Sequence, residues 1–168
     1  MPSLRFGILT VSDRSSLGER PDASGPMLAD VVAARGWNVV QTAIIPDEFD
    51  RIKSTLADWA DGDKLDVILT TGGTGFAPRD VTPEATRVVV ERLTPGLDEA
   101  MRGASLKITP HAMLSRAVSG IRKRTLIVNL PGSPKGAAEN LLAIVAVLEH
   151  AVQLLRDDSS SEKNHLAR

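Results

Sequence analysis

The sequence contains no cysteine and no tyrosine, and aromatic residues make up only 3% of it. Without cysteine the chain cannot form disulfide bonds, thiolate metal sites or a cysteine nucleophile. This absence is typical of proteins in a reducing compartment, so we expect a cytoplasmic protein. The scarcity of aromatic side chains argues against a surface that stacks nucleic-acid bases.

The chain also lacks an excess of charge of either sign and a long hydrophobic run. Its 20 Lys and Arg residues and 21 Asp and Glu residues give a formal net charge of −1, which argues against binding nucleic acid through net charge. No apolar run reaches the roughly 18 residues of a membrane span, and the opening MPSLRFGILTVSD has too short an apolar stretch for a signal peptide. We therefore expect neither nucleic acid nor a membrane as a partner.

What the sequence does contain is an alternation of apolar strand-like runs and helical patterns. Strands are predicted over 6–11, 37–45, 65–69 and 125–130, and helices over 26–36, 48–61, 83–93, 97–106 and 134–155, with a short helix after Thr109-Pro110. Because the strands are largely apolar, we predict an α/β fold with a mostly parallel sheet and helices on both faces. One domain is expected over 1–156, followed by a polar, serine-rich tail, 157–168, that is predicted to be disordered.

The most informative stretch is TTGGTGFAPRDVTPEAT, which follows the third predicted strand and ends in a helix start at Thr82-Pro83. Its glycine loop consists of Gly72, Gly73, Thr74 and Gly75. Glycines at such a turn let backbone N–H groups point into a concavity that suits an anion. The carboxylate of Asp80 suits a hard cation that bridges to phosphate. The pattern therefore indicates a phosphate-bearing ligand with magnesium, and the alternative is a tight connection that needs glycine only for positive φ.

Two better-known phosphate motifs do not fit this loop. A P-loop requires Gly-Lys followed by Ser or Thr, whereas Phe76 follows Gly75. The dinucleotide-binding fingerprint requires a glycine at the position of Pro78. An oxidoreductase that binds a dinucleotide is therefore disfavoured.

Short polar, acidic and glycine residues follow each of the four predicted strands. They are Ser12 and Asp13, then Asp47, then the glycine loop with Asp80, and finally Asn129, Pro131, Gly132 and Ser133. In open parallel sheets, ligands bind outside the carboxyl ends of the strands. Any one of these residues is compatible with ordinary turn chemistry, but their joint position favours a ligand site at that edge.

Taken together, these motifs resemble the molybdopterin adenylyltransferases of molybdenum cofactor biosynthesis. The resemblance covers about Phe6 to Leu155 and rests on TVSD, IIPDE, TTGGTGFAPRDVTPEAT, SLKITPHAMLSR and NLPGSPKG. It is especially close to the domain that is fused to a second module in plant and animal homologues such as gephyrin. The resemblance implies a three-layer α/β domain that assembles as a homotrimer. It also implies transfer of AMP from magnesium-ATP to the terminal phosphate of molybdopterin, with release of pyrophosphate, and a molybdenum insertase as a possible partner.

The resemblance further implies roles for individual residues. The family's two functional aspartates correspond to Asp47 and Asp80, which suit magnesium directly or through water. Binding residues implied by the match are Ser12, Asp13, Gly72, Gly73, Thr74, Gly75, Ser105, Ser115, Asn129, Pro131 and Gly132. Candidates for contacts to anions are Arg79, Lys107, Arg116 and Lys135, each of which also fits a solvated surface charge. The alternative function is a non-catalytic molybdopterin-binding or carrier module, which would keep the pocket without turning over ATP.

Overall fold

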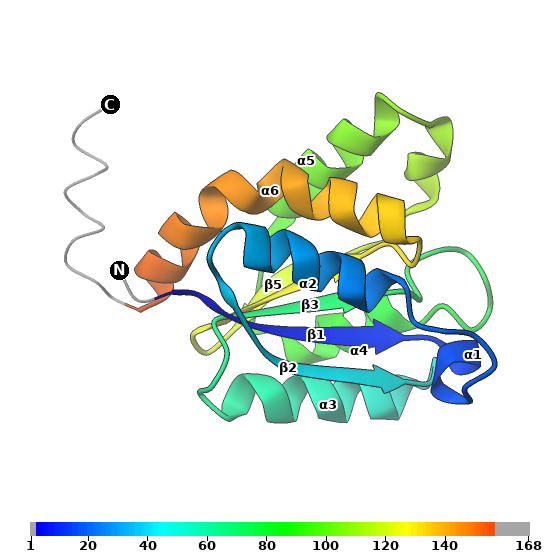
Figure 1. Cartoon of the computed structure of the whole chain (residues 1–168), viewed down its shortest axis with the longest axis horizontal. Helices are drawn as coiled ribbons and strands as arrows, with labels where there is room; N and C mark the ends of the chain where they lie inside the picture. Colours follow the sequence, from blue (N-terminus) through cyan, green and yellow to red (C-terminus); the bar gives the residue numbers. More distant parts are fainter. Residues whose placement is uncertain (1–2, 157–168) are drawn as a thin grey trace.

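The structure, a computed structural model, describes residues 3–156, so the predicted tail lies outside the described residues. Its elements, in chain order, are β1 Arg5–Val11, α1 Asp13–Ser16, α2 Ser24–Ala34, β2 Asn38–Ile45, α3 Phe49–Asp61, β3 Val67–Thr71, α4 Thr82–Val89, β4 Arg92–Leu93, α5 Pro95–Leu106, the 3-10 helix η1 Pro110–Leu114, β5 Ser119–Arg122, β6 Thr125–Leu130 and α6 Pro134–Leu155. Figure 1 shows β1, β2 and β3 running side by side in one direction. Their carboxyl ends therefore meet at one edge, beside α1.

The strands form one six-stranded sheet in the order β2-β1-β3-β6-β5-β4. Strand β1 is parallel to β2 and β3, and β3 is parallel to β6, whereas β5 is antiparallel to both β6 and β4. The predicted mostly parallel sheet is thus confirmed. The sequence pattern does not predict β4 and β5, because strands of two and four residues are too short to show a recognisable alternation.

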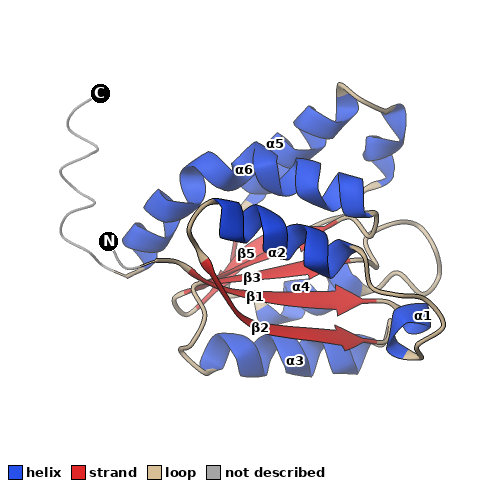
Figure 2. Cartoon of the chain, viewed as in Figure 1, coloured by secondary structure: helices blue, strands red, loops and turns tan. Residues whose placement is uncertain are grey.

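Helices cover both faces of the sheet, which gives three layers (Figure 2). On one face α2, α5 and α6 pack around a core that includes Leu28, Met101 and Leu141. On the other face α3 and α4 contribute Ile52 and Ala85 to a second core. Strands β3 and β6 are buried along their whole length, which explains why they are apolar without alternation.

Two helical segments differ from the prediction in ways that affect the site. A short helix, α1, lies between the first strand and α2, where the sequence pattern predicts neither helix nor strand, and the side chain of Ser12 accepts a hydrogen bond from the Ser15 N–H at its start. Helix α4 ends at Val89 instead of Leu93, because Val90 is extended and leads into β4. Both differences arise where the chain turns between closely spaced elements, and local periodicity is weakest there.

Helix α6 is long and apolar enough, by length and composition alone, to cross a membrane. This is weak evidence, because the core helix of a soluble protein passes the same test. Here Ala137, Leu141, Ile144 and Leu148 of α6 belong to the core under the sheet. Packing within the domain therefore accounts for much of the apolar character of the helix.

At the opposite edge of the sheet, the buried carboxylate of Asp66 joins the start of β1 to the end of α6. It accepts hydrogen bonds from the Arg5 backbone N–H at 2.8 Å and from the Arg5 guanidinium, and it pairs with Arg156 at 2.6 Å. Burial raises the pKa of Asp66, but the hydrogen bonds from Arg5 and Arg156 outweigh burial and hold the pKa below its usual value. The charged form of Asp66 therefore stabilises the folded state.

We predict that Asp66→Asn lowers the free energy of unfolding by about 1.5–3 kcal/mol at neutral pH. Because the pKa of Asp66 is depressed in the folded state, its contribution is fully present above the unfolded pKa of about 3.9 and is lost as the pH falls through the lower folded pKa. Urea unfolding at neutral pH and near pH 3 should show the gap between wild type and variant narrowing in acid. Asp30→Asn, at an exposed position of α2, is the control. An equal gap at both pH values would contradict this account.

Candidate functional site

The residues predicted to follow the strand ends do meet at one edge of the sheet. The parallel register places Val11 beside Ile45, Thr10 beside Thr71, and Thr71 beside Leu130. The segments that follow these residues are therefore neighbours. This edge lies at the right of Figure 1, beside α1 and the loop that leads to α4.

The glycine loop has a conformation that requires glycine at two positions. Gly72 has φ +105° and Gly73 has φ +67°, in the region that disfavours other residues. A side chain at Gly72 would collide with the Val11 carbonyl oxygen, and one at Gly73 would collide with the Thr82 hydroxyl. The loop therefore needs glycine at both positions, because φ is positive and because there is no room for a side chain. These two requirements fit a binding loop and a tight connection equally.

Thr82 holds this loop instead of capping the following helix. The sequence suggests Thr82 as the N-cap of α4, but the N-cap is Val81, which makes no side-chain capping bond. The buried Thr82 hydroxyl donates to the Gly72 carbonyl oxygen at 3.0 Å, and the Thr82 N–H donates to the Gly73 carbonyl oxygen at 3.2 Å. The start of α4 is therefore bonded directly to the glycine loop.

Asp13 and Asp47 form a reciprocal pair across the ends of β1 and β2. The Asp13 N–H donates to Asp47 Oδ2 at 2.9 Å, and the Asp47 N–H donates to Asp13 Oδ1 at 2.9 Å. Arg79 binds both carboxylate oxygens of Asp13 at 2.8 Å. The hydrogen bond from Arg79 lowers the pKa of Asp13, whereas burial raises the pKa of Asp47, and the nearby charges of Asp13 and Asp80 add to that rise. Asp13 is therefore paired with Arg79, whereas no cationic side chain among residues 3–156 lies within ion-pair distance of Asp47.

Asp47 and Asp80 both border the glycine loop. Asp47 Oδ1 lies 3.1 Å from the position that a Gly73 Cβ would occupy, and Asp80 Oδ2 lies 2.9 Å from the corresponding position at Gly75. No group of three or more His, Asp or Glu side chains suited to a metal occurs in residues 3–156. Magnesium commonly keeps several waters and uses one or two carboxylates together with substrate phosphates, so this pair fits its requirements.

Two cavities lie on either side of the glycine loop. The first cavity, of about 630 Å³, is lined by the end of β1, the start of α2 and the loop, including Ser12, Arg20, Asp22, Gly72 and Gly132. The second cavity, of about 300 Å³, lies under α5, η1 and the start of α6, and its lining includes Thr74, Gly75, Ser105, Ser115 and Asn140. Ser133 lines both cavities. The loop and its flanking aspartates therefore lie where two ligand spaces meet.

A family model described as "Probable molybdopterin binding domain" matches residues 7–150. The chain belongs to the molybdopterin-binding domain family. The matched region begins within β1 and ends within α6, so it contains nearly all helices and strands of the domain.

Relatives in this family are similar along nearly the whole chain. Molybdopterin adenylyltransferase of Helicobacter pylori is 41% identical over 157 residues, which cover 92% of this chain and 89% of that protein. The crystal structure of the molybdopterin biosynthesis enzyme MoaB from Thermus thermophilus is 52% identical, with a TM-score of 0.87 over 92% of this chain and 98% of that chain. The molybdenum cofactor synthesis protein cinnamon of Drosophila melanogaster is 48% identical over 95% of this chain, and the chain spans only 27% of its length.

Within this molybdopterin-binding domain, the structure places most predicted binding residues at the two cavities but puts Asn129 beneath them. The Asn129 side chain is fully buried and donates to Thr70 at 3.0 Å and to Thr86 at 2.9 Å. Its carbonyl oxygen accepts from the Val118 N–H at 3.2 Å. In this arrangement it ties β6 to β3 and α4 and has no direct contact with either cavity, contrary to the expectation of a pocket residue.

Sequence patterns missed three polar residues of the cavities. Arg20 lies in a segment without a motif, and its guanidinium donates to the Ser12 hydroxyl at 3.4 Å. Asp22 accepts from the Thr10 hydroxyl at 2.7 Å and from the Gly25 N–H at 3.1 Å, which fixes the start of α2. The Asn140 amide donates to the Ser105 hydroxyl at 2.9 Å. Asn140 lies among apolar residues on the buried face of α6, and sequence analysis can detect a polar residue at such a position.

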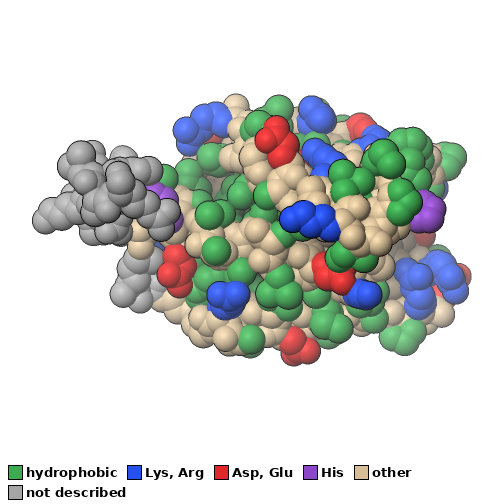
Figure 3. Space-filling model, turned by 90° about the horizontal axis from the view of Figure 1, so that it is seen from above, with side chains coloured by type: hydrophobic (Ala, Val, Ile, Leu, Met, Phe, Trp, Pro, Cys, Tyr) green, Lys and Arg blue, Asp and Glu red, His purple; other side chains and the backbone are tan. Residues whose placement is uncertain are grey.

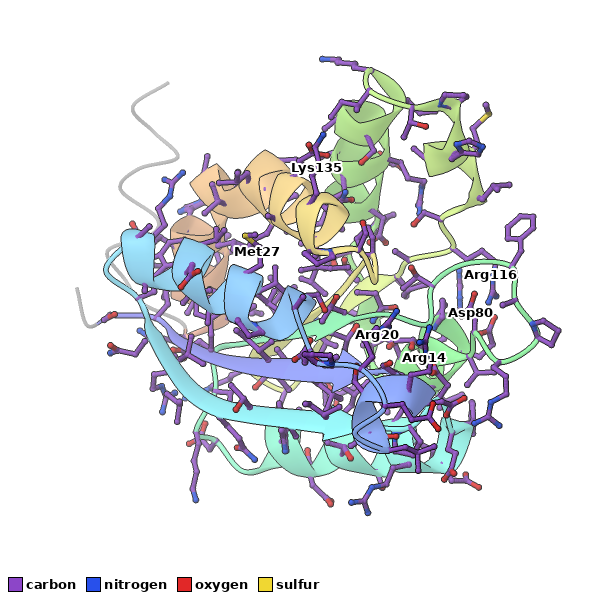
Figure 4. All side chains as sticks on the ribbon, turned by 45° about the vertical axis from the view of Figure 1, so that its right-hand side comes forward. Arg14, Arg20, Met27, Asp80, Arg116 and Lys135 are labelled. Atoms are coloured by element: carbon purple, nitrogen blue, oxygen red, sulfur yellow. The ribbon has the colours of Figure 1, made fainter. Side chains whose placement is uncertain are left out.

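Basic side chains surround the same edge. Figure 4 labels Arg14, Arg20, Arg116 and Lys135 there, on α1, the following loop, the segment after η1 and the start of α6. Such an arrangement favours anionic ligands. Lys135 pairs with Glu139 at 3.7 Å on an exposed part of α6, and the Arg116 guanidinium is bonded to other protein groups. Among the described Lys and Arg residues, Arg20 lines the first cavity and Arg102 lines the second.

Proposed function

We propose that this chain is a molybdopterin adenylyltransferase, which transfers AMP from magnesium-ATP to the terminal phosphate of molybdopterin and releases pyrophosphate. The observation that carries the proposal is the placement of the Asp47 and Asp80 carboxylates at a glycine loop between two cavities. A reaction that joins two phosphate-bearing molecules needs two ligand spaces that meet at the reacting phosphates. The family membership and the name of the Helicobacter pylori relative support the same reaction.

In this reaction an oxygen of the molybdopterin phosphate forms a bond to the α-phosphorus of ATP, and the bond from that phosphorus to the bridging oxygen of pyrophosphate breaks. Such transfers depend mainly on positioning and on stabilising charge, so no covalent group of the protein is required. Backbone N–H groups of the glycine loop bind phosphate oxygens, and Arg20 supplies positive charge to the first cavity. Asp47 and Asp80 would hold magnesium, which neutralises charge on the phosphates.

The test is incubation of the purified chain with molybdopterin, ATP and magnesium, followed by detection of adenylylated molybdopterin and of pyrophosphate. Reactions without ATP, or with excess chelator, serve as controls. We expect both products to form in equal amounts and only in the complete mixture. Binding of molybdopterin without formation of either product would instead identify a carrier module and reject the transferase.

We also propose that the chain assembles as a homotrimer, an arrangement that the family resemblance implies. Exposed hydrophobic side chains are scattered over the face formed by α2, α5 and α6 (Figure 3). They include Met27, Leu142 and Val147, which are 40%, 50% and 49% exposed. Single exposed apolar side chains are also common on monomers, so this face is the contact surface that we test, and the proposal itself rests on the family resemblance.

Light scattering behind size-exclusion chromatography should give three times the mass of one chain. Leu142→Lys combined with Val147→Lys should shift the protein toward smaller species if this face forms the contact. A monomer at micromolar concentration in the unsubstituted protein would reject the trimer. A trimer that persists in the double variant would place the contact on another face.

We further propose that the chain works in the cytoplasm and that a molybdenum insertase receives the adenylylated molybdopterin. Support for a recipient comes from cinnamon, a molybdenum cofactor synthesis protein in which a segment similar to this chain is one part of a longer polypeptide. An immobilised candidate insertase would be mixed with adenylylated molybdopterin or with unmodified molybdopterin, and the amount of each that it retains would be measured. Greater retention of the adenylylated form would support this recipient.

A further inference from the structure

The side chain of Arg116 lies inside the curve of the outer loop, defined as residues 75–80, and holds both of its ends. Arg116 Nε donates to the Gly75 carbonyl oxygen at 2.8 Å, and Nη2 donates to the Asp80 carbonyl oxygen at 2.7 Å. The Arg116 N–H also donates to the Thr74 carbonyl oxygen at 2.9 Å, and Nη1 pairs with Glu84. Figure 4 shows Arg116 and Asp80 together at this loop.

Apart from the bonds to Arg116, the outer loop is held on the Arg116 side mainly by two hydrogen bonds within the loop. Its own bonds run from the Asp80 N–H to the Ala77 carbonyl oxygen at 2.9 Å and from the Ala77 N–H to Asp80 Oδ2 at 3.0 Å. Phe76, at its tip, is 67% exposed and therefore adds little apolar anchorage. A further bond, from Arg79 to Asp13, joins the loop to α1 on the other side.

Arg116 is itself held in place from behind. Arg102 of α5 donates to the Ser115 carbonyl oxygen at 3.4 Å and to the Ala117 carbonyl oxygen at 3.2 Å, on either side of Arg116 in the chain. The guanidinium thus projects from a fixed segment, and its planar fork is the feature that lets one side chain bond two carbonyl groups. A lysine has a single ammonium group and cannot reproduce this geometry.

We propose that Arg116 is a positioning residue that holds Asp80 in place for adenylyl transfer, an inference that rests on the proposed function. Arg116 acts through the backbone of Asp80 and the end of the glycine loop, without contacting substrate. The alternative role is a direct contact to substrate phosphate; three of the five N–H donors of Arg116 are already bonded to Gly75, Asp80 and Glu84, and the comparison of KM with turnover below distinguishes the two roles. A loop that loses this support carries its carboxylate away from the reacting phosphates.

Arg116→Ala should lower the turnover number roughly 10- to 100-fold while the KM for molybdopterin changes little, because small misplacement of a catalytic group lowers the rate of chemistry more than binding. Arg116→Lys should be nearly as impaired, since it keeps the charge and loses the fork. Guanidinium chloride at a non-denaturing concentration should partly restore turnover in Arg116→Ala, whereas ammonium chloride at equal ionic strength should not. A residue needed only for folding would not show this selective rescue.

Glu84→Gln is the matched control, because it removes the ion pair to Arg116 and leaves both carbonyl contacts intact. Its turnover should stay close to that of the wild type. Unchanged turnover in Arg116→Ala would overturn the proposal, as would a loss in Glu84→Gln equal to that in Arg116→Ala. A large rise in the KM for molybdopterin or ATP with unchanged turnover would instead assign Arg116 to substrate binding.

A second measurement, made without substrates, separates this inference from the proposed function. Hydrogen exchange of the Ala77 and Asp80 amides should be faster in Arg116→Ala than in the wild type and should slow again with guanidinium. If the wild type makes no adenylylated product, the proposed function fails, and exchange alone then decides whether Arg116 holds the loop. Unchanged exchange at both amides would overturn that role in either case.

Discussion

Asp80→Asn should lower the rate of adenylyl transfer roughly 100- to 1,000-fold, the scale seen when one electrostatic contact to a developing charge is removed. The side chain keeps an oxygen that can accept the Ala77 N–H, so the outer loop should retain its shape. What is lost is the negative charge that would hold magnesium beside Gly75. Binding of molybdopterin should change much less, because that charge matters most as the transition state forms.

Asp47→Asn should have a similar effect on activity. Asp47 Oδ2 accepts the Asp13 N–H, and an asparagine side chain keeps an oxygen that can accept the same N–H. Because burial raises the pKa of Asp47, loss of its charge should leave the free energy of unfolding at neutral pH unchanged or slightly higher. The double variant should lose much less activity than the two single losses combined, as expected for residues that act as a unit on one ion.

Turnover and molybdopterin affinity for the three variants at several magnesium concentrations would test this shared site. Asp30→Asn is the matched control, since it makes the same chemical change on the exposed side of α2. It should leave both quantities unchanged. Near wild-type turnover in either Asp47→Asn or Asp80→Asn would rule out a magnesium ion shared by the two aspartates.

Gly73→Val should remove most of the affinity for phosphate-bearing ligands while the chain still folds. The new side chain must adopt φ near +67°, where a β-branched residue is strained, and it meets the Thr82 hydroxyl and Asp47 Oδ1. We expect the free energy of unfolding to fall by about 1–3 kcal/mol. The loss of affinity follows because the glycine loop must shift away from Asp47 to accommodate the side chain.

Calorimetry with ATP and molybdopterin, together with circular dichroism and urea unfolding, would measure both effects. Gly103→Val is the matched control: Gly103 lies within α5, and a Cβ there meets nothing within 4 Å. That variant should change the free energy of unfolding by about 0.5 kcal/mol or less. Unaltered affinity in Gly73→Val would exclude the glycine loop from the binding site.

The sequence by itself determines the layers of the fold and the edge at which the site lies. Strands β3 and β6 are apolar along their length because both faces are covered, and this pattern is visible without coordinates. The glycines are equally informative, because a chain that needs φ of +105° at Gly72 has almost no other choice of residue. Such features are local, since each depends on the conformation or burial of a few neighbouring residues.

Only the tertiary structure decides which charges meet at that edge. Arg116 is 36 positions from Asp80, and Arg79 is 66 positions from Asp13, so no local spacing relates the members of either pair. The same holds for Asn129, whose partners at Thr70 and Thr86 lie on other elements. A sequence pattern records how often a residue type recurs along the chain. The partner of a polar side chain is instead selected by the packing of separate elements, which leaves no periodic signal in the sequence.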